Sequence, residues 1–309
     1  MKQLMTATRM NCLLDCPRKH YWRYEVGLKR ETDSAALRFG TAWHAAMEDR
    51  WQRRPYESAL AKALATADDF DEATVATLSG LLAGYYRRWQ DDPVKELHPE
   101  VEFRHPLRGS RSFDCAGKID GLGILHDGRL ALVEHKTTGT DISPGSDYWI
   151  RLRANPQVLQ YVIAAWSLGW DLHTVLYDVT RKPAIRVKKG ESPEEYSERL
   201  AKDCEARPDF YFARREVPIL QDDVESFHIQ RVELAKLILN FRAAARKARR
   251  PEQAWPRHLT EMQCRLCDYA SFCLQNIVPD PAQPPAGFRV GAQHPELNQA
   301  ADPTQGETR

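Results

Sequence analysis

The chain lacks a long apolar run, an excess of charge of one sign and a phosphate-binding loop. Its longest uninterrupted hydrophobic stretch, residues 161–166, has six residues, whereas a helix needs about 20 to span a bilayer. The first ten residues lack the apolar segment of a secretory signal. The 44 Lys and Arg residues nearly balance the 43 Asp and Glu residues, and no G-x4-G-K-[ST] motif is present. We therefore expect a cytoplasmic protein without a membrane span or a helicase motor.

The composition indicates a folded protein with a tail of a different kind. The 309 residues are 42% hydrophobic and 28% charged, which excludes a largely disordered chain. The 35 residues after Leu274 hold six prolines and few large apolar groups. We expect an ordered part over residues 1–274 and a disordered proline-rich tail over residues 275–309.

Helical and strand-like patterns alternate along the ordered part. Large apolar side chains recur every fourth residue from Phe39 to Trp51, and a second helix is expected to end near Trp89. Strands are expected over residues 101–107, 112–119, 130–134 and 174–180, and helices over 155–166, from 193, and over 224–249. This order predicts an α/β core with helical elaborations on either side.

Two of the expected strands end in groups that suit metal-dependent hydrolysis. Asp120 ends one strand, and Glu134, His135 and Lys136 end the next. Side chains alternate in a strand, so Glu134 and Lys136 share a face and His135 points away. If the strands pair, Asp120 lies beside Glu134, and the two carboxylates repel unless a divalent cation or a shared proton compensates. Mg²⁺ or Mn²⁺ would suit these oxygens, and Lys136 would supply a cation near a reacting phosphate. The alternative is a surface salt bridge between Glu134 and Lys136.

Three further polar residues have helical spacing near these strands. His44 lies on the same helical stripe as Gly40 and is either a core histidine or a ligand. Gln157 and Tyr161 are four residues apart on the helix after the Glu-x-Lys strand. Gln157 could donate to phosphate or hold a water, and Tyr161 could contact a DNA backbone. Such i,i+4 polar pairs are also common on helices without a function.

The cysteines gather near both ends of the chain. Cys264, Cys267 and Cys273 form a C-x2-C-x5-C motif, a spacing that lets three thiolates hold one soft metal centre. His258 could supply a fourth ligand to zinc, and Cys16 could complete an all-cysteine site, with Cys12 as its rival. Buried free thiols are the remaining interpretation. The odd total of seven cysteines argues against a disulfide framework.

Basic residues are concentrated on the expected helix over residues 224–249. They are Lys236, Arg242, Arg246, Lys247, Arg249 and Arg250. A basic helix end commonly complements the helix dipole, and in a nuclease it could also follow phosphates. Aromatic and basic residues also alternate over 18–24, where they could stack on single-stranded DNA or pack around a metal cluster.

The order of these motifs resembles the RecB-type branch of the PD-(D/E)xK nucleases. The chain is most similar to iron–sulfur members such as the AddB nuclease domain, the CRISPR-associated RecB-like exonucleases and phage exonucleases. The resemblance covers residues 12–273. It rests on Cys-Pro-Arg-Lys-x-Tyr at 16–21, Gly-x3-His at 40–44, Gly-x-Ile-Asp at 117–120, Glu-x-Lys-Thr at 134–137, Gln-x3-Tyr at 157–161 and the cysteine motif at 264–273.

The resemblance implies a fold and a set of site residues. The fold is a restriction-endonuclease-like core, with a mixed central sheet flanked by helices, a helical N-terminal insertion and a C-terminal iron–sulfur clasp, in a single domain over residues 1–274. Asp120, Glu134 and Lys136 match catalytic residues, and Gln157 and Tyr161 match residues that hold the active site and substrate. The implied metal ligands are His44, Asp120, Glu134 and the His135 carbonyl; the implied [4Fe–4S] ligands are Cys16, Cys264, Cys267 and Cys273.

The implied activity is that of a Mg²⁺- or Mn²⁺-dependent DNA exonuclease with a 5′→3′ bias. Such an enzyme resects DNA ends in recombination or repair, and a phage or prophage enzyme would hand single strands to an annealing protein. Alternatives are a CRISPR-adaptation nuclease, a catalytically inactive DNA-binding module held by its cluster, and a zinc-stapled binding protein.

Overall fold

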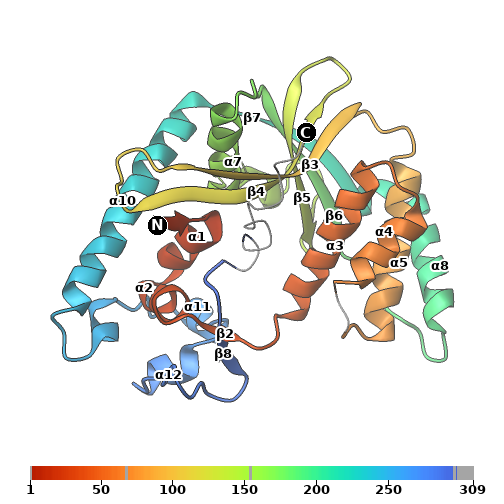
Figure 1. Cartoon of the computed structure of the whole chain (residues 1–309). Coiled ribbons are helices and arrows are strands. Elements are labelled where there is room, and N and C mark those ends of the chain that lie inside the picture. The colour runs from red at the N-terminus through yellow and green to blue at the C-terminus, as the bar shows by residue number, and fades with distance from the viewer. Residues whose placement is uncertain (1, 67–68, 153–154, 295–296, 298–309) are drawn as a thin grey trace, which may run out of the picture. The chain divides into compact units, whose positions relative to one another are not determined.

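The computed structural model describes residues 2–66, 69–152, 155–294 and 297 (Figure 1). The chain forms two compact units, each assembled from separate stretches of sequence. Unit 1 comprises Met1–Asp33, Arg104–Gly117 and Glu225–Arg309, and unit 2 comprises Ser34–Phe103 and Lys118–Val224. The sequence predicts one domain over residues 1–274. Contacts between distant stretches define the two units, and the single domain remains a prediction.

Unit 2 contains a mixed sheet, which confirms the predicted α/β class. Its strands are β3 (Glu96–Pro106), β4 (Phe113–Ile124), β5 (Leu130–Thr138), β6 (Thr174–Arg181) and β7 (Phe212–Pro218), of which β3 and β4 run on into unit 1. β4 pairs with β3 and β5, β5 is antiparallel to β4 and parallel to β6, and β6 is antiparallel to β7. Parallel neighbours need a crossover connection, and the stretch between β5 and β6 contains the predicted helix, α7 (Pro156–Ser167), which Asn155 caps.

Helices of unit 2 supply most of its core. They are α3 (Ala35–Trp51), α4 (Tyr56–Leu64), α5 (Glu72–Arg88), α6 (Asp147–Ile150), α8 (Pro193–Ala206) and α9 (Pro208–Tyr211). α5 packs closely on α8, since a Cβ atom at Gly84 would lie 2.5 Å from the Cβ of Cys204. Helix α4 was not predicted as a separate element, because its buried residues are the small Ala59 and Ala63.

Unit 1 joins the two ends of the chain. Its elements are β1 (Gln3–Met5), α1 (Ala7–Asp15), α2 (Pro17–His20), a π-helical turn (Tyr21–Val26), β2 (Leu28–Arg30), most of α10 (Gln221–Ala245), a 3-10 turn (Pro251–Ala254), α11 (Glu261–Arg265), α12 (Ala270–Leu274) and β8 (Phe288–Val290). β1 is parallel to the first residues of β4, and β2 is antiparallel to β8. No helix in the described part of the chain is long and apolar enough to cross a membrane.

Strand β8 differs from the disordered tail predicted for residues 275–309. Phe288 is buried among Trp22, Leu28, Tyr269 and Phe272 in a cluster that includes both chain ends. The packing of Phe288 and the pairing with β2 thus hold this strand within a proline-rich stretch. The last residues of the predicted tail, 298–309, lie outside the described residues.

Candidate active site

Two carboxylates lie side by side where β4 and β5 pair. The antiparallel register joins Gly121 to Val133, so Asp120 and Glu134 are the next residues of the two strands. Glu134 is fully buried and Asp120 is 9% exposed. The backbone N–H of His135 donates to Oδ2 of Asp120 over 2.9 Å, which fixes one carboxylate against the strand that carries the other. The predicted proximity of the two groups is present.

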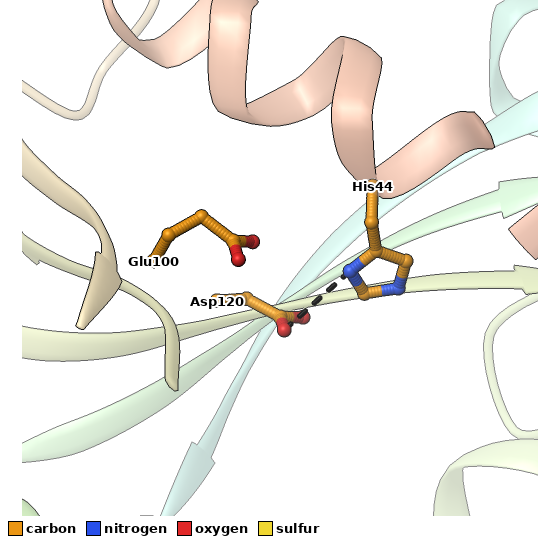
Figure 2. A group of neighbouring side chains, drawn as sticks. All are labelled: His44, Glu100 and Asp120. Atoms are coloured by element: carbon orange, nitrogen blue, oxygen red, sulfur yellow. Dashed lines mark ion pairs between the residues drawn. The ribbon is translucent and has the colours of Figure 1, made fainter. Parts of the chain in front are cut away.

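His44 on α3 and Glu100 on β3 lie close to Asp120 (Figure 2). One possible ligand atom of each residue lies within 4.8 Å of the other two, and Nδ1 of His44 is 3.4 Å from Oδ1 of Asp120. One imidazole and two carboxylates are donors that suit Mn²⁺ or Mg²⁺. The group does not include Glu134, whose Oε1 lies 2.5 Å from Nζ of Lys136.

Glu100 is a candidate ligand that sequence reasoning missed. Glu100 and Glu102 occupy alternate positions of one strand, so no spacing rule distinguishes them. The backbone of Glu100 has a φ of 55°, in the left-handed region that few non-glycine residues adopt. This interrupts the strand alternation, and Glu102 is exposed while Glu100 is partly buried and paired with Lys118. Burial raises the pKa of the Glu100 carboxyl.

The substitution Glu100→Gln is expected to weaken Mn²⁺ binding by about tenfold or more, because it removes an anionic oxygen beside the predicted ligands. Isothermal titration calorimetry at pH 8 measures the affinity. Glu102→Gln is the matched control, since it makes the same change two residues away on an exposed side chain. Equal Mn²⁺ affinities for both variants and the wild type would exclude Glu100 as a ligand.

Lys136 is held by the helix that follows its strand. Nζ of Lys136 donates to Oε1 of Gln157 over 3.1 Å, and Nε2 of Gln157 donates to the Tyr161 hydroxyl over 3.0 Å. The Lys136 side chain remains 24% exposed. The structure therefore brings the Gln-x3-Tyr motif to the Glu-x-Lys motif, with the lysine ammonium partly open to solvent.

The His135 ring belongs to a buried charged network that the sequence did not predict. Its Nδ1 lies 3.3 Å from Oδ2 of Asp178 on β6, and Nη2 of Arg214 on β7 lies 3.2 Å from the same oxygen. The Tyr85 hydroxyl also donates to this carboxylate. Burial alone would raise the pKa of Asp178, but the Arg214 charge together with the contacts to His135 and Tyr85 outweighs burial and lowers the pKa. The Trp51 ring lies in tilted contact with the same imidazole, with 5.7 Å between ring centroids. These contacts hold the strand between the two residues predicted to act in catalysis.

The two carboxylates differ in their affinity for protons. Burial, reinforced by the charge of Asp120, raises the pKa of Glu134 to about 7. Burial would raise the pKa of Asp120 as well, but the charge and hydrogen bond of His44 reverse the shift and lower it to about 2. Desolvation opposes the positive charge of His44, and the attraction of Asp120 overcomes it, so the pKa of His44 is raised. The surroundings thus favour the protonated forms of Glu134 and His44 and the ionised form of Asp120.

Metal binding is therefore expected to release protons and to strengthen as pH rises from 6 to 8. Glu134 must be ionised and His44 neutral to act as ligands, and both raised pKa values oppose these states at low pH. As the pH is lowered, we expect the Mn²⁺ affinity to fall by up to about tenfold per pH unit for each proton that metal binding releases. Calorimetry in buffers of different ionisation enthalpy counts the protons. An affinity that does not change between pH 6 and 8 would contradict this interpretation.

The four cysteines of the predicted clasp line one cavity in unit 1. The cavity has a volume of about 350 Å³, and Arg18, Lys19 and Arg257 also line it. Its cysteines are Cys16, Cys264, Cys267 and Cys273. Among the described residues, no three of these sulfurs lie within 4.8 Å of one another. The rival Cys12 is buried outside the cavity lining, and burial raises its pKa to about 12.

Comparison with known families identifies the class of the protein. Residues 4–274 match the PD-(D/E)XK nuclease superfamily, and the chain belongs to this superfamily. No curated protein matches the chain. Among solved structures, the crystal structure of SSO0001 is similar, with 12% identity, 87% of this chain and 96% of that chain covered, and a TM-score of 0.32. A likeness at this level supports no argument about function.

Proposed function

We propose that the protein is a Mg²⁺- or Mn²⁺-dependent DNA exonuclease that degrades DNA from its ends with a 5′→3′ bias. The observation that carries the proposal is the convergence of Asp120, Glu134 and Lys136 within the neighbouring strands β4 and β5, next to their paired residues. Inactivated nuclease modules typically lose one of these groups, and here all three are present. Superfamily membership supports hydrolysis of phosphodiester bonds, and the 5′→3′ bias rests on the resemblance of the motifs.

The donors at this centre fit a divalent cation. We assign His44, Asp120, Glu134 and the His135 carbonyl as its ligands, with Glu100 beside them. The buried position of Glu134 beside Asp120 supports this assignment, since burial and the neighbouring charge raise the pKa of Glu134 and a divalent cation would favour its ionised form. When bound, the cation polarises a phosphoryl oxygen and lowers the pKa of an attacking water.

The remaining residues position the reacting groups. Lys136 places a positive charge next to Glu134, where negative charge develops on a phosphate in the transition state. The Gln157 amide holds the lysine ammonium, and its hydrogen bond to Tyr161 orients the amide. In this proposal Gln157 and Tyr161 also contact the substrate, since both lie on the helix next to the lysine.

We propose that the cysteine cavity holds a [4Fe–4S] cluster. A tetrahedral zinc with bonds of about 2.3 Å would draw its sulfurs to within about 4 Å of one another. A [4Fe–4S] cluster, in which each thiolate binds a different iron, would instead use all four cysteines that line this cavity. Arg18, Lys19 and Arg257 supply positive charge around four anionic ligands. The cluster would tie Cys16 to a motif that begins 248 residues later.

The proposed setting is recombination or repair of the phage or prophage type. In this setting, the enzyme resects a DNA end and passes the remaining strand to a single-strand annealing protein. The resemblance of residues 137–181 to phage enzymes supports this setting over CRISPR adaptation.

Digestion of end-labelled DNA tests the proposed activity. Linear single- and double-stranded DNA, labelled at either the 5′ or the 3′ end, is incubated with the wild type and Mg²⁺ or Mn²⁺. Immediate release of short 5′-labelled products, with gradual shortening of 3′-labelled strands and no cut in covalently closed circles, is expected. Earlier release of the 3′ label would show that degradation runs in the opposite direction, 3′→5′. Binding without any cleavage would favour the inactive DNA-binding module.

A further inference from the structure

A basic hollow lies on unit 1, which does not contain the carboxylates of the candidate active site. It has a volume of about 680 Å³, and its lining holds four cations and no carboxylate. The lining residues are Lys2, Gln3, Arg111, Ser112, Leu239, Arg242 and Arg246. They come from the N-terminal stretch, the turn before β4 and helix α10. Three separate stretches of sequence thus place positive charge around one opening.

Two of these cations are free to bind a ligand. Arg111 and Arg246 are exposed, and neither has a carboxylate within 4.0 Å in the described part of the chain. The other two are partly neutralised, Lys2 by Asp114 at 3.3 Å and Arg242 by Glu25 at 2.7 Å. Arg111 and Arg246, which have no such partner, therefore give the hollow most of its net positive charge.

A second hollow shares Arg242 and Arg246 with the first and adds aromatic side chains. It has a volume of about 340 Å³, and Tyr21 and Trp255 line it. Tyr21 is partly exposed, whereas Trp255 is fully buried. Its one acidic residue, Glu25, is bound by two arginines, because Arg9 lies 3.4 Å from the carboxylate that Arg242 also contacts. A basic track with an accessible aromatic ring is the combination that binds single-stranded DNA through phosphates and stacked bases.

The charge of the whole unit agrees with this arrangement. Unit 1 carries 21 Lys and Arg residues against 14 Asp and Glu residues, while unit 2 carries 23 against 29. The near-neutral total of the chain therefore conceals a basic unit and an acidic unit. An anionic polymer is attracted to the basic unit 1 and repelled by the acidic unit 2, except where a bound cation compensates the negative charge of unit 2.

We propose that the two adjoining hollows bind the sugar–phosphate backbone of a DNA strand, as a second contact surface of the proposed nuclease. Arg111 and Arg246 bind phosphates, and Tyr21 stacks on a base. All four cations line the first hollow, and Arg242 and Arg246 also line the second, where Tyr21 is accessible. This continuous surface of cations and an aromatic ring suits a strand of phosphates and bases better than one free anion. This inference rests on the proposed function for its choice of DNA as the ligand.

Equilibrium binding of a fluorescein-labelled 30-nucleotide single strand to the full-length protein in EDTA tests the proposal. The double variant Arg111→Ala/Arg246→Ala removes two phosphate contacts. Each contact on a single strand contributes about 0.7 to the slope of log K against log salt, so the slope should become shallower by about 1.4. With equal affinities at 1 M salt, this change corresponds to about 25-fold weaker binding at 0.1 M salt. The double variant Lys188→Ala/Lys189→Ala is the control, because it removes two exposed charges from unit 2.

The outcomes separate this inference from the proposed function. Wild-type affinity and salt slope in the arginine variant, or an equal loss in the lysine control, would overturn the inference. Full displacement of the DNA by millimolar inorganic phosphate would overturn it in favour of a small-anion pocket. A variant with the wild-type melting temperature and the expected loss of binding supports the inference, even if the wild type fails to cleave DNA with Mg²⁺ or Mn²⁺. That failure would concern the proposed catalysis alone.

Discussion

Lys136→Ala is expected to lower the rate of DNA cleavage by about 10²- to 10³-fold or more while DNA binding is retained. The substitution removes the cation that lies 2.5 Å from Oε1 of Glu134 and is hydrogen-bonded to Gln157. Groups that stabilise charge only in the transition state contribute to the rate much more than to ground-state affinity. Single-turnover digestion of labelled DNA and equilibrium binding in EDTA measure the two effects separately.

A lysine outside the site provides the matched control for this result. Lys202 on α8 is exposed and belongs to the same unit as Lys136. Lys202→Ala should cleave DNA at the wild-type rate. Cleavage by Lys136→Ala at that same rate would refute the assignment of the active site.

Cys16→Ala is expected to lose the metal cluster and much of the soluble protein. Cys16 lines the same cavity as the three cysteines at 264–273. Closing a loop of about 250 residues costs much conformational entropy, so a metal-centred clasp stabilises the folded state against a large opposing term. We expect anaerobically purified wild type to be brown and to absorb near 400 nm, and the variant to lack both this absorbance and its iron.

Cys12→Ala is the control for the cluster prediction. Cys12 lies four residues before Cys16 and is buried, but it does not line the cavity. This variant should keep its iron. Normal folding and iron content in Cys16→Ala would contradict the clasp. Stoichiometric zinc in the wild type would show that the cavity holds zinc instead of an iron–sulfur cluster.

Local sequence patterns predicted the elements that position the candidate site. Large apolar residues recur every fourth position from Phe39 to Trp51 because they form the buried face of α3. His44 lies on the same helix, nearer the surface. Alternation in β5 correctly separated the His135 ring from Glu134 and Lys136, as their different partners show. These features depend on residues a few positions apart, which fix the direction of neighbouring side chains.

The features that sequence reasoning missed depend on tertiary contacts or on local backbone conformation. Glu100 reaches the site from a left-handed position that residue spacing does not reveal. The Asp178 network unites three strands and α5, and Phe288 of β8 packs in a core made by distant residues. The same limit applies to the basic hollows, since their cations come from three separate stretches.

Metal-dependent cleavage by the wild type and Asp120→Asn tests the central claim most directly. Asp120 is the residue that His44, Glu100 and the His135 N–H all approach. We predict that the wild type degrades linear DNA when Mn²⁺ or Mg²⁺ is added and stops when EDTA is added, and that Asp120→Asn remains folded but inactive at every metal concentration. Cleavage that persists in EDTA, or a wild-type rate for Asp120→Asn, would contradict the account.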